Sequence, residues 1–242
     1  MIAVVGLAFE ARIIAGPGVR VICSGDGRNL SQSLTAAINE VRAAKDGHLG
    51  LISFGVAGGL DPRLKPGSCI VGSTIVSETD AIATDRSWSQ RLLRAIPDAV
   101  HGPIVGVPAP ITSREAKRIL FQESGAVAVD MESHIVAATA VEHGIPLAAI
   151  RVVTDPAERS LPACAVAAMR PNGTTDIVAM VRSILKRPRE LPALFRTMLD
   201  AYAARDALLR GRRMLGPHLG SVEVGAVNIG AVDIGTLELG AC

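Results

Sequence analysis

Residues 49–60 read LGLISFGVAGGL, and this stretch decides the fold. Leu49–Phe54 is an apolar run typical of a fully buried strand. A glycine-rich loop would follow it, made of Gly55, Val56, Ala57, Gly58 and Gly59. In an open α/β sheet, ligands bind beyond the carboxyl ends of the strands, and glycine lets a ligand approach the backbone closely. The stretch therefore predicts a ligand-binding loop, with a tight strand-exit turn as the plainer alternative.

Short apolar runs alternate with longer amphipathic ones along the rest of the chain. We expect strands at residues 2–5, 19–23, 68–76, 104–107, 126–129 and 147–153. We expect helices at residues 29–44, 87–96, 131–142, 175–186 and 190–213. Alternation of this kind is typical of an α/β fold.

The last stretch of the chain has a different composition. Glycine recurs almost every five residues through 216–242, in GPHLGSVEVGAVNIGAVDIGTLELGAC. A short Gly/Val/Ile repeat can bury little apolar surface by itself. We therefore expect residues 1–215 to form one domain and residues 216–242 to be an appendage.

The composition excludes several classes of protein. With 49% apolar and 20% charged residues the chain is not disordered, and a net charge of +2 gives no reason to expect nucleic-acid binding. The four cysteines form no C-x-x-C pair and the histidines lack zinc-ligand spacing, so no metal is expected. No signal peptide and no apolar run of about 18 residues is present, which favours free thiols and a cytoplasmic location.

Charged residues occur at positions where burial is expected. Asp130 and Glu132 lie where a predicted strand meets a helix; the helix N-terminus alone could explain them, or they could hold a pair of hydroxyls. Arg151 lies within a very apolar strand and Asp155 at its exit, and charges there are costly unless paired or used. Glu10 follows the first strand. These residues are the candidates for a functional site.

Three ordered motifs resemble the superfamily of nucleoside phosphorylases and nucleosidases, which includes methylthioadenosine/S-adenosylhomocysteine nucleosidase. Its Gly-x-Ala-Gly-Gly-Leu motif is similar to Gly55–Leu60, its Val-[Glu/Asp]-Met-Glu motif to Val129–Glu132, and its Arg-x-x-[Ser/Thr]-Asp motif to Arg151–Asp155. The resemblance spans roughly residues 1–186. It implies a three-layer αβα sandwich with a twisted mixed sheet, assembled as a homo-oligomer.

Further segments resemble the hopanoid-associated phosphorylase subfamily, as far as about Gly220. They are GLAFEARI (6–13), ATDRSW (83–88), AVDMESHI (128–135), MRPNGTTD (169–176) and LLRGRRMLGPHLG (208–220). This resemblance implies phosphorolysis of adenosylhopane, which releases adenine on the way to ribosylhopane. Hydrolysis of a methylthioadenosine- or S-adenosylhomocysteine-type nucleoside is the alternative.

The resemblance also implies roles for the candidate residues. Asp155 would be the general acid at purine N7, and Glu132 would bind the ribose hydroxyls with Met131 packed on the sugar. Arg151, with the backbone amides of Gly55, Val56, Ala57 and Gly58, would hold the nucleophile. Glu10 would orient the nucleophile or the sugar. Phosphate is the expected co-substrate, because the arginine fork matches two of its oxygens, and no other cofactor is expected.

Two features depart from the family pattern. Val56 replaces a serine or threonine often found in the glycine motif, which removes a hydroxyl near the nucleophile. Lys117 falls near the position of the aromatic residue that stacks on the base in nucleosidases. In place of that aromatic residue, aliphatic side chains could line the pocket, which would suit a bulky triterpene substituent.

Other classes of function are weaker. Val21–Leu30 resembles the start of a dinucleotide-binding unit, but Leu30 stands where the third glycine belongs, which argues against an NAD-dependent oxidoreductase. A nucleotide-binding protein without activity would leave Arg151 and Asp155 without a use. The motifs of serine hydrolases, P-loop NTPases and zinc proteases are absent.

Residues 182–213 combine nine basic with three acidic residues. An apolar stripe is expected on the same helix, formed by Leu191, Leu194, Phe195, Met198 and Tyr202. A helix with both features could contact an anionic membrane surface, which would give access to a lipid-linked nucleoside. The alternative is that the stripe packs on the catalytic core.

Overall fold

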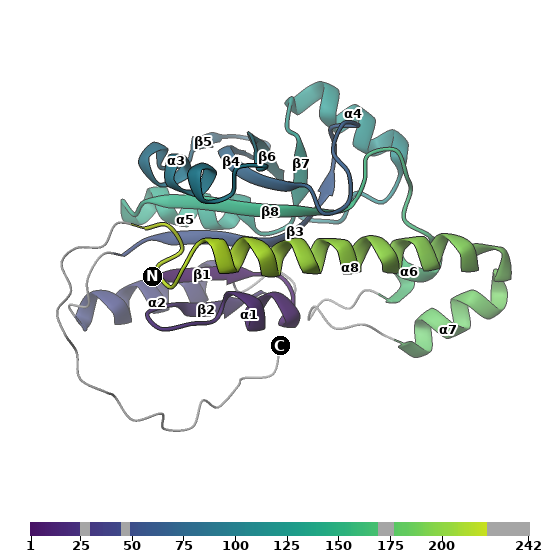
Figure 1. Ribbon diagram of the computed structural model, residues 1–242, viewed down its shortest axis with the longest axis horizontal. Helices are drawn as coiled ribbons and strands as arrows, with labels where there is room; N and C mark the ends of the chain where they lie inside the picture. The colour runs from purple at the N-terminus through teal and green to yellow at the C-terminus, as the bar shows by residue number, and fades with distance from the viewer. Residues whose placement is uncertain (25–29, 45–48, 169–176, 222–242) are drawn as a thin grey trace.

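The computed structural model describes residues 1–24, 30–44, 49–168 and 177–221. The strands are β1 (Ile2–Val5), β2 (Arg20–Cys23), β3 (Leu51–Gly59), β4 (Cys69–Val76), β5 (Ala81–Ala83), β6 (Val100–Gly106), β7 (Ala128–Asp130) and β8 (Leu147–Asp155). The α-helices are α1 (Ala8–Ile14), α2 (Leu30–Ala43), α3 (Arg86–Ala95), α4 (Arg114–Ser124), α5 (Ser133–His143), α6 (Ala163–Ala168), α7 (Ile177–Lys186) and α8 (Leu191–Met214), with a 3₁₀ turn η1 (Pro188–Glu190) before α8. Figure 1 shows their arrangement.

All eight strands belong to one mixed sheet. β2, β1, β3 and β8 run parallel in that order, and β8 pairs antiparallel with β4. β4 continues in parallel to β6 and then β7, and β7 pairs antiparallel with the end of β3. The pairings therefore lead from β3 back to β3, so the sheet closes on itself at one end.

Helices cover both faces of the sheet, as the αβα expectation requires. One hydrophobic core packs α2 and α5 against the sheet, through residues such as Leu34 and Val136. The other packs α1, α3 and the long α8 against the opposite face, through Ile14, Trp88 and Leu208. The expected fold class is thus confirmed.

The glycine-rich segment differs from its expectation. It is not a loop, because β3 continues to Gly59; it pairs with β8 from Leu51 to Gly58 and with β7 at its end. A strand without Cβ atoms lets neighbouring groups approach its faces. A Cβ at Gly59 would lie 3.1 Å from Val153 Cγ1, and one at Gly58 would lie 3.1 Å from Val129 Cγ1.

The sequence patterns did not predict α1, α4, α6 or β5. Helix α4 nevertheless has clear end signals. The Ser113 side chain accepts a hydrogen bond from the Ala116 amide at its start, and Gly125 adopts a left-handed conformation at its end.

The expectation of free thiols holds for Cys69 and Cys164 but not for Cys23. Cys69 and Cys164 carry free thiols, whereas Cys23 is disulfide-bonded and Cys242 lies outside the described residues.

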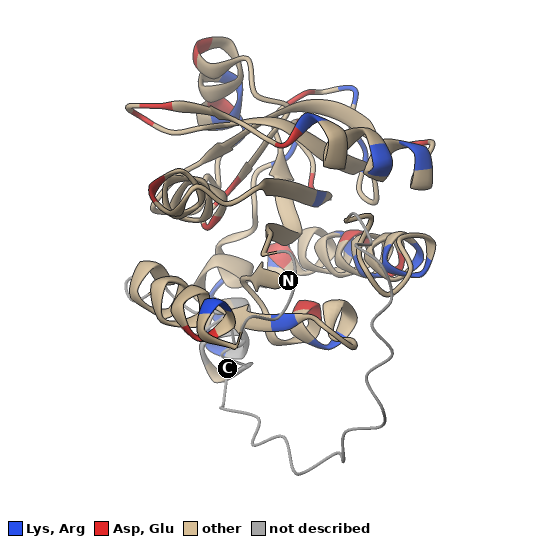
Figure 2. Cartoon of the chain, turned by 90° about the vertical axis from the view of Figure 1, so that its left-hand side faces the viewer, with Lys and Arg blue, Asp and Glu red and all other residues tan. Residues whose placement is uncertain are grey.

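Basic and acidic residues are interspersed over most elements, as Figure 2 shows. In the described part of the chain, no helix is both long enough and apolar enough to span a bilayer. The packed chain extends to Gly220, since Leu219 is fully buried; most of the glycine-repeat tail lies outside the described residues.

Candidate active site

Arg151 lies in the middle of β8 with 1% of its side chain exposed, and its guanidinium is surrounded by acceptors. Nε forms an ion pair with Asp130 Oδ2 at 2.6 Å, although its N–H is not aligned for a hydrogen bond. Nη2 donates to Ser53 Oγ at 2.7 Å and to Glu132 Oε2 at 3.3 Å, while Nη1 donates to the Val56 carbonyl at 3.3 Å. Since a buried guanidinium is tolerated only when paired, this network explains why β8 can carry Arg151.

Asp130 orients that network. Its Oδ1 accepts from the Ser133 amide at 3.0 Å, and its Oδ2 accepts from the Ser133 hydroxyl. Ser133 Oγ in turn lies 2.9 Å from Ser53 Oγ. Asp130 thus connects the start of α5 to Arg151, and its carboxylate is engaged on both oxygens.

Glu10, from the first turn of α1, is held by three backbone amides. Its Oε2 accepts from Gly6 and Leu7 at 2.9 Å each, and its Oε1 accepts from Val56 at 2.7 Å. The side chain lies where a Cβ at Gly55 would be, since such an atom would stand 2.5 Å from Glu10 Oε1. Burial raises the pKa of Glu10, and the Arg151 charge and the three amide hydrogen bonds partly oppose this.

Glu132 precedes α5, and 14% of its side chain is exposed. A Cβ at Gly6 would stand 2.8 Å from Glu132 Oε1, so glycine at the end of β1 makes room for this carboxylate. Burial raises the pKa of Glu132 to about 7; Arg151 opposes the shift, whereas the negative charges of Asp130 and Glu10 add to it. Three carboxylates therefore share one arginine, and one of them titrates near neutral pH.

Asp155, at the end of β8, forms a separate ion pair. Its Oδ2 lies 2.6 Å from Lys117 Nζ, and 11% of its side chain is exposed. Burial raises the pKa of Asp155, while the charge and hydrogen bond of Lys117 oppose the rise. Lys117 itself is fully buried in α4, so it does not stack on a base from the position that the family resemblance suggested.

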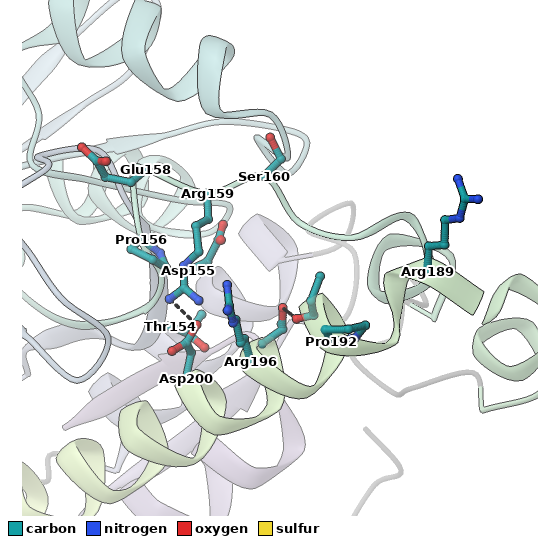
Figure 3. Close-up of a pocket in the computed structure, with 12 residues that line it drawn as sticks. Thr154, Asp155, Pro156, Glu158, Arg159, Ser160, Arg189, Pro192, Arg196 and Asp200 are labelled. Carbon is teal, nitrogen blue, oxygen red and sulfur yellow. Dashed lines mark hydrogen bonds and ion pairs between the residues drawn. The ribbon is translucent and has the colours of Figure 1, made fainter. Parts of the chain in front are cut away.

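A pocket of about 470 Å³ opens beside Asp155, between the segment after β8 and the first turns of α8 (Figure 3). Arg159 spans this gap by an ion pair with Asp200 at 2.5 Å. The wall is formed by Thr154, Asp155, Pro156, Glu158, Arg159, Ser160, Arg189, Pro192, Ala193, Arg196, Thr197 and Asp200. Residues 151 and 155 are separated by about 13 Å along the strand, at roughly 3.3 Å per residue. The Arg151 cluster and the pocket therefore lie at two different points along β8.

The remaining predicted site residues lie on β3 and where β7 meets α5. Met131 is half-buried where β7 meets α5. Gly55, Val56, Ala57 and Gly58 lie within β3 in register with β8, and the Val56 amide already donates to Glu10. The structure thus brings Glu10, Glu132 and Arg151 together and places Asp155 beside the pocket. The sequence patterns assigned no functional role to Lys117. The signals at the two ends of α4, Ser113 and Gly125, are the only sequence features that could have predicted a helix around it.

The sequence model of the phosphorylase superfamily matches residues 5–186, which contain every residue of the site named in the motifs. No curated protein sequence matches this chain. Solved structures do resemble it. The futalosine hydrolase of Helicobacter pylori is 17% identical, with 88% of this chain and 94% of that one covered and a TM-score of 0.59.

Two further solved structures show the same degree of likeness. The 5′-methylthioadenosine/S-adenosylhomocysteine nucleosidase of Helicobacter pylori is 17% identical, covering 88% of this chain and 95% of that one with a TM-score of 0.58. Its counterpart from Neisseria meningitidis is 18% identical, covering 88% and 98% with a TM-score of 0.57. At such identities the likeness establishes a common fold.

Proposed function

The chain belongs to the phosphorylase superfamily, and on this premise we propose that it hydrolyses the N-glycosidic bond of a 5′-substituted adenosine, releasing adenine. The similar solved structures are a futalosine hydrolase and methylthioadenosine/S-adenosylhomocysteine nucleosidases, which supports a nucleoside substrate. Water rather than phosphate is the nucleophile in this proposal. The charge balance around Arg151 is the observation that carries it.

Phosphate binding requires free N–H donors and positive charge. Each nitrogen of Arg151 already faces an acceptor (Asp130, Glu132, Ser53 or Val56), and the side chain is buried, which disfavours binding of a second anion. The amides that could cradle an anion already bind the carboxylate of Glu10. Three carboxyl groups surround one arginine, so its positive charge is already balanced, which disfavours phosphate and leaves an acceptor for a proton of water.

Each residue of the site then has one role in the proposed reaction. The C1′–N9 bond breaks with its electron pair going to the purine, whose N7 takes a proton from Asp155 beside the pocket. Glu132 accepts hydrogen bonds from the ribose hydroxyls, and the negative cluster stabilises the cationic sugar as it forms. Water attacks C1′ and gives its proton to Glu10. Proton donation to a leaving group contributes about 10²–10⁴-fold.

Phosphorolysis of adenosylhopane remains the prediction drawn from the subfamily resemblance, with phosphate as co-substrate. The homo-oligomeric state, the cytoplasmic location and contact with the inner membrane surface also remain predictions. Adenosylhopane is compatible with the proposal above as a substrate, because the nature of the nucleophile and the 5′ substituent are independent questions.

One assay decides between water and phosphate. Adenine release from methylthioadenosine, adenosine and adenosylhopane would be followed with and without phosphate, in ¹⁸O-labelled water. We expect equal rates in both conditions and one ¹⁸O atom in the free ribose product. Glu10→Gln should lose activity by about two to four orders of magnitude, whereas the exposed Glu40→Gln should not. A phosphate-dependent rate with a ribose 1-phosphate product would establish phosphorolysis instead.

A further inference from the structure

Lys117 makes an unusual set of contacts for a lysine. Its side chain has no exposed surface, and fully buried lysines are rare unless paired. Nζ donates to Asp155 Oδ2 at 2.6 Å, to the Pro156 carbonyl at 3.0 Å and to the Arg159 carbonyl at 3.0 Å. An ammonium has three N–H donors, and all three are matched here. Lys117 is therefore held as a cation whose position is fixed by the segment that follows β8.

Asp155 is engaged on one side only. Its Oδ2 faces Lys117, whereas Oδ1 has no hydrogen bond or ion pair within the described part of the chain, and Asp155 lines the pocket. A leaving base in that pocket would thus meet an acid whose second oxygen is already bonded to a cation. When Asp155 gives up a proton from Oδ1, the carboxylate that remains is stabilised by the ammonium 2.6 Å from Oδ2.

The other charges around Asp155 are weaker influences. Arg159, from the segment after β8, favours the carboxylate but is paired with Asp200 of α8, which opposes it. Glu158, Arg189 and Arg196 complete the charged part of the pocket wall. Lys117 is the largest of the influences that lower the pKa of Asp155. Burial in turn lowers the pKa of Lys117, although Asp155 opposes that shift.

We propose that Lys117 is a positioning residue for the leaving-group acid: it fixes Asp155 at the pocket and stabilises the carboxylate that forms when the proton passes to the base. This inference rests on the proposed glycosidic cleavage. In the step, the Asp155 O–H bond breaks as the N7–H bond forms, and Lys117 keeps all its protons. Lys117 therefore sets how readily Asp155 acts as an acid without itself transferring a proton.

Lys117→Gln and Lys117→Arg test this assignment, because the first removes the charge and the second keeps it. A carboxyl without its cationic neighbour has a higher pKa, by about 1–3 units for a close pair. A plot of kcat against pH should decline on its basic side as Asp155 loses its proton. In Lys117→Gln this basic limb should therefore move to higher pH by about that amount. Adenine release should fall about 10–100-fold, since the acid is weaker and its second oxygen is no longer held. Lys117→Arg should leave this basic limb within about half a pH unit of its wild-type position.

A substrate that needs no leaving-group proton separates this role from simple support of the fold. A 4-nitrophenyl riboside expels a stable phenolate, so Lys117→Gln should hydrolyse it within about threefold of the wild-type rate. Arg118→Gln, which removes an exposed charge from the same helix, is the matched control and should change neither substrate's rate. The Asp155 carboxyl should also titrate at higher pH in Lys117→Gln when followed by ¹³C NMR, independently of activity.

The outcomes distinguish the two proposals. If the wild-type protein releases no adenine from any nucleoside, the proposed function fails, and the ¹³C titration still shows whether Lys117 acts on Asp155. If the wild-type protein is active but Lys117→Gln shifts neither the basic limb of kcat against pH nor the ¹³C titration of Asp155, the assignment of Lys117 is wrong. Equal losses on the nucleoside and the nitrophenyl riboside would also overturn it, because they would reduce Lys117 to a support of the segment after β8.

Discussion

Glu132 and Asp155 are both largely buried carboxyl groups, but they have different charged neighbours. Glu132 shares Arg151 with two other acids, Asp130 and Glu10, and its pKa is raised to about 7. Asp155 has a lysine of its own, which keeps its pKa from rising as far as burial alone would bring it. Burial raises the pKa of both carboxyls, so their proposed roles rest on position: Asp155 lines the pocket, whereas Glu132 faces Arg151.

The pH dependence of turnover should report Glu132. It binds ribose hydroxyls as a carboxylate, so protonation below its pKa removes an acceptor, and kcat/KM should fall as pH drops through about 7. Glu132→Gln should lower kcat/KM by about 10–100-fold, as expected for a lost charged hydrogen bond, and should abolish this acidic limb. Steady-state kinetics from pH 5 to 9 would measure both effects, with Glu142→Gln on the same helix as the control.

A 2′-deoxyribosyl substrate provides the matching deletion. Removing the hydroxyl and removing its acceptor delete the same interaction, so the combined loss should be smaller than the sum of the two free-energy changes. Fully additive losses would mean that Glu132 does not contact the 2′-hydroxyl.

At the residue scale, the sequence predicted buried charges but not their partners. Arg151 was recognisable because a charge in an apolar strand needs a partner, and the structure supplies Asp130 and Glu132. Lys117 was not recognisable, because its partner Asp155 lies 38 residues later and α4 itself was missed. An ion pair between segments so distant in sequence leaves no periodic pattern.

Among the elements, β3 and α8 show how pattern and tertiary context diverge. The glycines after Phe54 resemble a loop when only local preferences are considered, since glycine weakens an isolated strand. In the folded chain β8 pairs with β3 from Leu51 to Gly58, and the missing Cβ atoms are required by Glu10 and by neighbouring strands. The helical pattern of residues 190–213, by contrast, was long enough to predict α8 from spacing alone.

Helix α8 exposes most of its expected apolar stripe. Leu194 is buried, but Leu191, Phe195, Met198 and Tyr202 are 46–63% exposed, so the stripe does not pack on the core. Exposed basic residues flank it, namely Arg187, Arg189, Arg196 and Arg205. An apolar surface bordered by arginines suits an anionic lipid surface, to which each basic residue contributes about 1 kcal/mol.

We therefore expect the protein to float with anionic liposomes at low salt and to be released at high salt. Phe195→Ser combined with Tyr202→Ser should abolish flotation, whereas Val141→Ser, at an equally exposed position on α5, should not. Arg212 is unsuitable for such a test, because it donates to the carbonyls of Ile14 and Gly216. If the double variant instead converts a dimer to monomers in solution, α8 forms a subunit interface and the lipid prediction is wrong.

For the whole molecule, the fold class followed from the alternation of strands and helices, but the closure of the sheet did not. Closure depends on the antiparallel pairing of β7 with the end of β3, which involves only Gly58 and Gly59 on one side and Ala128 and Val129 on the other. Two residues per strand carry no hydrophobic period that could predict a pairing. The same limit applies to the chain end, where a glycine-rich pattern concealed residues that complete the core.

Leu219 illustrates this point. Its side chain is fully buried beside Trp88, Leu92 and Leu215, and its carbonyl accepts from Trp88 Nε1 at 2.9 Å. Its φ of 50° lies in the left-handed region, which is unfavourable for leucine, so packing must outweigh that cost. Arg91 Nε also donates to the Gly220 carbonyl at 2.6 Å, which ties the segment after α8 to α3.

Shortening Leu219 should therefore destabilise the entire domain. Leu219→Ala leaves a cavity in the core between α3 and α8, which costs about 2–4 kcal/mol. For a domain of this size the Tm should fall by roughly 4–16 °C, measured by calorimetry on the full chain. Met214→Ala, at an exposed position at the end of α8, is the matched control and should change the Tm by little. A chain ending at Leu215 should melt well below one ending at Ser221, since both lack the tail and only the second keeps Leu219. Equal melting temperatures for these two chains would show that residues 216–221 do not close the core, and that the domain is complete at the end of α8.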